Sequence, residues 1–118
     1  MKITRADYYS FSLVLLLSWG TFLPAAYGEG TPQDYKEALK WYVKAAEQGD
    51  AESQVNLGVM YGLGQGTLQD YVRAHMWFNL AAASGITKAV QQRDRTAKLM
   101  TPQQISEAER MAREWKKK

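Results

Sequence analysis

One stretch of sequence occurs twice in this chain of 118 residues, and it decides the fold. GEGTPQDYKEALKWYVKAAEQGD, at residues 28–50, returns 36 residues later as GQGTLQDYVRAHMWFNLAAASGI, at residues 64–86. Eleven of the 23 aligned positions are identical. A period between about 20 and 50 residues is typical of solenoids, in which stacked supersecondary units share one continuous core. The repeat therefore predicts a solenoid or part of one.

Each copy contains the pattern of an amphipathic helix. Apolar side chains recur every three or four positions in residues 34–48, and the same pattern returns in residues 70–84. Gly49 follows the first pattern and Gly85 the second. Glycine commonly ends helices because it adopts the left-handed conformation without strain. Each copy is therefore predicted to supply one helix with a defined end.

A third helix is predicted between the two copies, at residues 51–61. Its Gln54, Leu57, Gly58 and Tyr61 fall on one face at spacings of three and four. Glycine inside a helix costs about 1 kcal/mol relative to alanine. We expect that cost to be offset by a neighbouring helix whose backbone approaches closely at Gly58.

The last third of the chain departs from the repeat. Residues 87–100 are predicted to form an atypical helix, and residues 101–118 a C-terminal capping helix. Thr101 and Gln104 form the ends of a capping box, a motif that starts helices. The apolar stripe of the helix that follows consists of Ile105, Ala108, Met111, Ala112 and Trp115. A polar outer face would close the solenoid and keep it soluble.

Eleven residues of the second unit follow one signature. They are Leu57, Gly58, Tyr61, Gly64, Gly66, Asp70, Ala74, Trp77, Ala81, Ala82 and Gly85. This pattern resembles the Sel-one-like repeat family, a short-repeat relative of the tetratricopeptide repeats. The resemblance covers a full repeat at residues 51–86 and half a repeat at residues 29–50. It implies an all-α fold, a short α-solenoid of antiparallel helix pairs with about one and a half repeats plus a C-terminal capping helix pair.

The resemblance also implies that the protein binds other proteins. In tetratricopeptide-like solenoids the first helix of each pair lines the concave face. By that analogy Glu52, Asn56 and Met60 are expected to be exposed and to contact a partner.

Residues 1–28 have the features of a signal peptide. Lys2 and Arg5 precede an apolar run at residues 11–23, and small residues stand at positions 26 and 28, before a predicted cleavage site. Cleavage would give a periplasmic or secreted protein that begins near Glu29. The alternative is a leader retained as an inner-membrane anchor, although a spanning helix needs about 20 apolar residues and this run is shorter.

No motif in the sequence names a reaction. The chain has no cysteine, and His75 is its single histidine, so we expect neither a metal site nor a cofactor. No serine is followed three residues later by lysine, as a penicillin-binding or β-lactamase mechanism requires. A cell-wall-directed hydrolase remains a weak alternative. From residue 29 onward, 13 basic and 11 acidic residues leave a net charge of +2, too small to suggest a nucleic-acid surface.

Two expectations concern packing. Trp41, Trp77 and Trp115 fall on helix stripes at repeat positions, which predicts that all three lie in the core. The helix at residues 34–48 lacks an antiparallel partner, because the leader occupies the matching positions. Its apolar face should be partly open once the leader is removed. We therefore expect the protein to self-associate through this open face, or to be stabilised by a partner that binds there.

Overall fold

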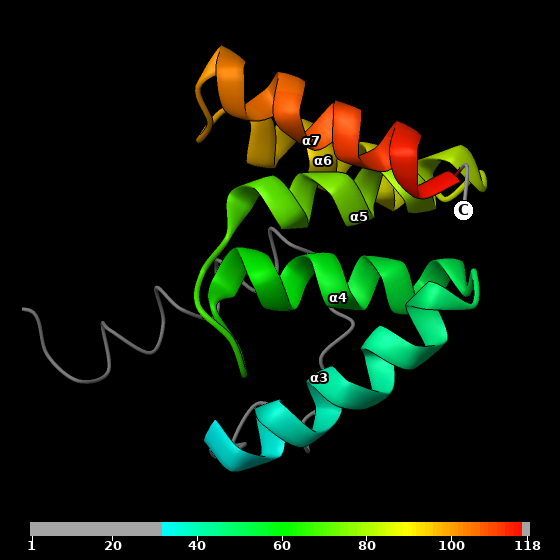
Figure 1. The fold of residues 1–118 in the computed structure, drawn as a ribbon, viewed down its shortest axis with the longest axis vertical. Coiled ribbons are helices and arrows are strands. Elements are labelled where there is room, and N and C mark those ends of the chain that lie inside the picture. Colours follow the sequence, from blue (N-terminus) through cyan, green and yellow to red (C-terminus); the bar gives the residue numbers. More distant parts are fainter. Residues whose placement is uncertain (1–31, 117–118) are drawn as a thin grey trace, which may run out of the picture.

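A computed structural model of the protein describes residues 32–116. These residues form helices and no strand, in the order α3 (Pro32–Glu47), α4 (Ala51–Leu63), α5 (Tyr71–Ala83), α6 (Thr87–Ala97) and α7 (Pro102–Lys116). The helices are stacked in chain order, from α3 at the bottom of Figure 1 to α6 and α7 at the top. The predicted all-α, solenoid-like class is confirmed. The predicted signal peptide lies outside the described residues.

Side-chain caps fix where the helices begin. The carboxylate of Asp70 accepts a hydrogen bond from the backbone N–H of Arg73 at 3.0 Å, so α5 starts directly after Asp70. The predicted capping box is present before α7. The backbone N–H of Gln104 donates to the Thr101 hydroxyl oxygen at 3.1 Å, and the Thr101 N–H donates to the Gln104 side chain at 2.9 Å.

Helices α4 and α5 pack against each other through Gly58. A β-carbon added to Gly58 would lie 2.6 Å from Cε1 of Phe78, which is less than any van der Waals contact allows. Phe78 is fully buried, so its ring has no free space to move into. The close approach predicted at Gly58 is therefore confirmed, but the neighbour is an aromatic ring rather than a backbone.

Helix α5 is the centre of the core. The buried residues Val55, Val59, Ala74, Phe78, Ala81 and Ala89 join it to α4 and α6. The buried residues Ala46, Leu57, Met76, Trp77, Leu80 and Ala112 join it to α3, α4 and α7. Because α5 contributes to both clusters, it packs directly on α4, α6 and α7.

The Gly-x-Gly segment of the repeat, residues 64–66 in the second copy, forms the turn between successive units. Gly66 has φ +75°, and a β-carbon there would lie 2.5 Å from the backbone carbonyl oxygen of Tyr35. The loop before α5 thus lies directly on the backbone of the first turn of α3. Only glycine combines this left-handed conformation with so close an approach.

The tryptophans at equivalent repeat positions differ in burial. Trp77 is 5% exposed and meets Trp115 of α7 in an edge-to-face contact, with 5.0 Å between the ring centres. Trp41 is 63% exposed, so the expectation that it lies in the core was wrong. The physical reason is its neighbourhood. Trp77 packs against Trp115 of α7 and shares a buried cluster with Leu57 of α4, whereas Trp41 has no such cover among residues 32–116.

Substitution Gly58→Ala tests the contact with Phe78. The methyl group gains about 1 kcal/mol of helix propensity, but overpacking a closed core costs about 1–3 kcal/mol. We expect a net loss of stability of up to about 2 kcal/mol, measured by urea unfolding. Phe78→Leu removes the clashing ring atoms, so Gly58→Ala should cost less in that background. Additive effects in the double variant would contradict the contact.

Candidate partner-binding surface

The structure places α4 and α6 in equivalent positions of successive units. The 36-residue offset of the repeat maps Glu52 onto Lys88, and these two side chains form an ion pair with Oε2 and Nζ 3.0 Å apart. Both side chains stay largely in solvent, 60% and 43% exposed respectively. This pair was missed by the sequence comparison, because residues 87–97 lack the Leu-Gly and Tyr signature of the repeat.

The three residues predicted to face a partner differ in exposure along α4. Glu52 is exposed, Asn56 is half-buried and Met60 is 1% exposed. The expected exposure of Met60 was therefore wrong. Helix α4 packs against both α3 and α5, and every residue from Leu57 to Met60 is buried. The equivalent residue in α6, Thr96, is likewise fully buried.

Between the exposed and the buried ends lie two amides at equivalent positions. Asn56 in α4 and Gln92 in α6 are 36 residues apart, and the side-chain oxygen of each is buried without a hydrogen-bond partner among residues 32–116. A buried acceptor without a partner costs about 1–3 kcal/mol. The first turns of α4 and α6 therefore present an ion pair, and one turn further along each helix lies an amide oxygen without a hydrogen-bond partner among residues 32–116.

The signature residues have structural roles. Leu57, Gly58, Ala74, Trp77 and Ala81 are buried, and Tyr61 and Ala82 are partly buried against the core. Gly64, Gly66 and Gly85 have positive φ in the turns, and Asp70 caps α5. These residues determine how the units stack and leave recognition to other positions.

A buried polar group lies where α5 meets the last two helices. His75 is 4% exposed, and its Nδ1 has no hydrogen-bond partner among the described residues. Burial lowers the pKa of its imidazole, and Arg93 of α6 lowers it further, while Glu109 of α7 and Asp94 act in the opposite direction. Arg93 also donates a hydrogen bond to Asn79 Oδ1 at 3.2 Å. The described residues contain no group of acidic and histidine side chains placed to hold a metal ion.

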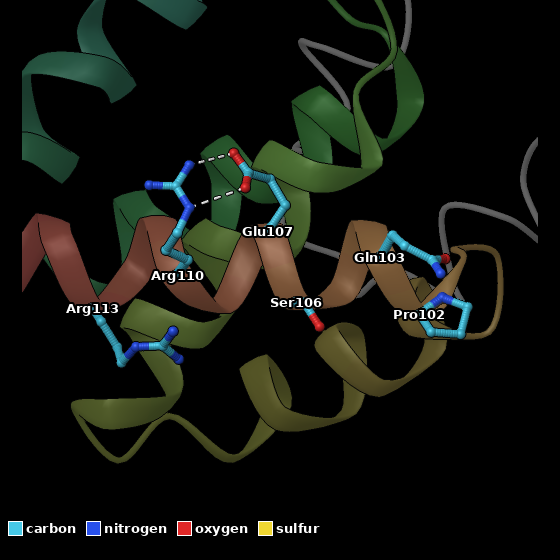
Figure 2. A pocket seen from close by; sticks show the side chains of 6 residues that line it. All are labelled: Pro102, Gln103, Ser106, Glu107, Arg110 and Arg113. Atoms are coloured by element: carbon cyan, nitrogen blue, oxygen red, sulfur yellow. Dashed lines mark hydrogen bonds and ion pairs between the residues drawn. The ribbon is translucent and has the colours of Figure 1, made fainter.

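A shallow polar pocket of about 480 Å³ runs along α7. It is lined by Pro102, Gln103, Ser106, Glu107, Arg110 and Arg113 (Figure 2). Arg110 Nε donates to Glu107 Oε2 at 3.0 Å, and Nη1 donates to Glu114 Oε1 at 2.7 Å. These bonds lower the pKa of Glu107 and raise that of Arg110, which keeps both charged. The charges of this pocket are thus largely satisfied within one helix, as expected for the outer face of a cap.

The pKa of His75 predicts a pH dependence of stability. Because burial lowers the pKa of His75 in the folded protein, the unfolded chain binds a proton more readily below the ordinary histidine pKa of 6.5. The stability that His75 contributes is therefore present above about pH 6.5 and is lost as the pH falls below it. His75→Leu should lose less unfolding free energy than the native protein between pH 7.5 and pH 5.5. An equal loss in both proteins would contradict this assignment.

Comparisons with known proteins agree with this architecture. The Sel1 repeat model matches residues 25–50 and 51–86. A search of curated proteins finds no match. The fold is similar to the crystal structure of a protective antigen that is present in uropathogenic Escherichia coli strains and displays an SLR fold, with a TM-score of 0.68 and 31% identity. That match covers 96% of this chain and 22% of the antigen, so the chain spans about a fifth of its length. Since the repeat matches cover more than half of its residues, the chain belongs to the Sel1 repeat family.

Proposed function

We propose that this protein is an exported, non-catalytic interaction module that binds another protein across the first turns of α4 and α6. Repeats of this family generally mediate contacts between proteins. The observation that carries the proposal is the pair of unpartnered amide oxygens of Asn56 and Gln92, next to the Glu52–Lys88 ion pair.

Physical chemistry supports this surface over the other faces of the described helices. The ion pair offers both signs of charge, so it favours a polar segment with complementary charges at the rim. Asn56 is half-buried, and rotation of its side chain would bring the amide to the surface. Backbone N–H groups of a bound segment would then supply the missing hydrogen bonds. The energy that the free protein loses at the Asn56 amide would be recovered on binding.

The absence of catalysis is part of the proposal. A hydrolase of the triad type needs a base within reach of substrate. His75 is 4% exposed, and burial favours its uncharged form by lowering its pKa. The polar pocket on α7 holds its acid and base in ion pairs within the helix. A hydrolase screen with cell-wall glycans and peptides should accordingly show no turnover.

Export rests on the character of residues 1–28 and is tested by the N-terminus of the native product. None of the helices in residues 32–116 is long and apolar enough to cross a membrane. We expect N-terminal sequencing of the protein from the periplasmic or secreted fraction to begin near Glu29. An intact Met1 in the membrane fraction would contradict cleavage and would favour the membrane-tethered alternative.

Arginine substitutions test the proposed surface. Glu52→Arg together with Asn56→Arg replaces an ion pair by repulsion from Lys88 and fills the amide site with a long cation. Recovery of partners in a pull-down from the native fraction should fall at least about tenfold, the equivalent of 1.4 kcal/mol of binding free energy.

The matched control is Gln103→Arg together with Ser106→Arg. Both positions are exposed on α7, and the substitutions add the same number of arginines away from the proposed surface. The control should recover partners as the native protein does. Unchanged recovery by the Glu52 and Asn56 double variant, with an unchanged circular dichroism melt, would rule out this surface.

A further inference from the structure

The outward face of α3 is not covered by another helix of residues 32–116 in the way that the equivalent face of α5 is. Trp41 is 63% exposed on this face, whereas the equivalent Trp77 is 5% exposed and packs against Trp115 of α7. Beside Trp41 lies a pocket of about 380 Å³, whose lining is mostly apolar and includes Leu39 and Val43. An exposed tryptophan beside an apolar pocket is a feature of protein interfaces rather than of free surfaces.

The polar residues around this pocket show which partner fits. Glu37, Lys40, Trp41 and Lys44 recur at spacings of three and four, so they form one stripe along α3. All four line the pocket. Glu37 and Lys40 form no ion pair within residues 32–116, and Lys44 Nζ lies 5.2 Å from the centre of the Trp41 ring. In chain order, the stripe therefore carries an acidic, a basic, an aromatic and a second basic side chain.

This order is complementary to itself when two helices run antiparallel. A two-fold axis midway between residues 40 and 41 places Glu37 of one copy opposite Lys44 of the other, twice by symmetry. Across this axis, residues on the same side of the stripe meet, so each Trp41 ring lies beside Trp41 of the other copy. Glu37 and Lys44 then have complementary partners, both tryptophans leave water, and the exposed Lys40 side chains extend into solvent at the rim.

We propose that the outward face of α3 binds a second copy of this protein, in an antiparallel helix pair centred between Lys40 and Trp41. A pair of single helices buries less area than a standard interface, so the dimer should be weak and in exchange with the monomer. The inference concerns a different surface from the one proposed for other partners, so either proposal can fail without the other.

Other occupants fit the stripe less well. On the outer face of α7 from another copy, which would extend the solenoid head to tail, Glu107 and Glu114 already pair with Arg110. That face would therefore present the positive charge of Arg113 to the lysines of the stripe. An acidic segment of a different protein would pair with the lysines but would repel Glu37. The self-complementary order favours the second copy over both.

A charge exchange tests the proposal with the native, exported protein. Sedimentation equilibrium between about 1 and 500 μM should show a monomer–dimer equilibrium. Glu37→Lys or Lys44→Glu alone places like charges opposite each other and should weaken dimerisation at least about tenfold. The double variant Glu37→Lys with Lys44→Glu restores opposite charges and should return to within about threefold of the native constant. Trp41→Ala should weaken the dimer at least about thirtyfold.

The control variant is Lys98→Glu, which makes the same charge change as Lys44→Glu but at an exposed position outside the stripe. It should dimerise like the native protein. A native protein that stays monomeric at 500 μM would overturn the proposal, and so would species larger than a dimer, which indicate head-to-tail stacking. A double variant whose dimerisation constant stays as weak as that of the single variants would also overturn the proposal. N-terminal sequencing of the same sample shows whether residues 1–28 are present. A monomer that retains them would assign the face to the chain's own leader instead.

Discussion

The contact between the Phe78 ring and Gly58 sets the distance between α4 and α5, and the remaining helices are positioned by this pair. Phe78 belongs to the cluster that reaches Ala89 of α6, and its neighbours along α5 belong to the cluster that reaches α3 and α7. Any change that widens the α4–α5 spacing therefore moves both clusters. This coupling explains why the repeat signature is dominated by small and aromatic residues.

The two copies of the repeated helix differ where their surroundings differ. Leu39 and Val43 in α3 pack against the apolar cluster of α4 and α5. The equivalent residues in α5 are His75 and Asn79, which face the charged side chains of α6 and α7. The apolar positions of α3 are thus polar in α5, where the neighbouring helices carry charged side chains.

The sequence was sufficient to predict the elements that depend on local chemistry. The capping box at Thr101 and the apolar stripe of α7 both follow from spacing alone, and the structure confirms each of them. The need for glycine at position 58 was also predictable. Its neighbour Phe78 was not, because a sequence pattern cannot show which side chain of another helix fills the space.

Burial that depends on neighbouring units was harder to predict. Trp41 and Trp77 occupy the same repeat position, so periodicity gives them the same environment, yet one is exposed and the other buried. Met60 was assigned to the surface by analogy with tetratricopeptide-like solenoids, but it is 1% exposed in this fold. The ion pair of Glu52 with Lys88 required knowing that α6 continues the repeat without its signature. The partner-binding role of Glu52, Asn56 and Met60 remains a prediction.

Photo-crosslinking in the native cell tests the central claim most directly, namely that the first turns of α4 and α6 form the partner-binding surface. A photoreactive phenylalanine analogue replaces Glu52 in one variant and Ser106, an exposed residue of α7, in a second. The account predicts a covalent adduct with another protein from position 52 and little from position 106. Adducts from position 106 at equal or higher yield than from position 52 would contradict it.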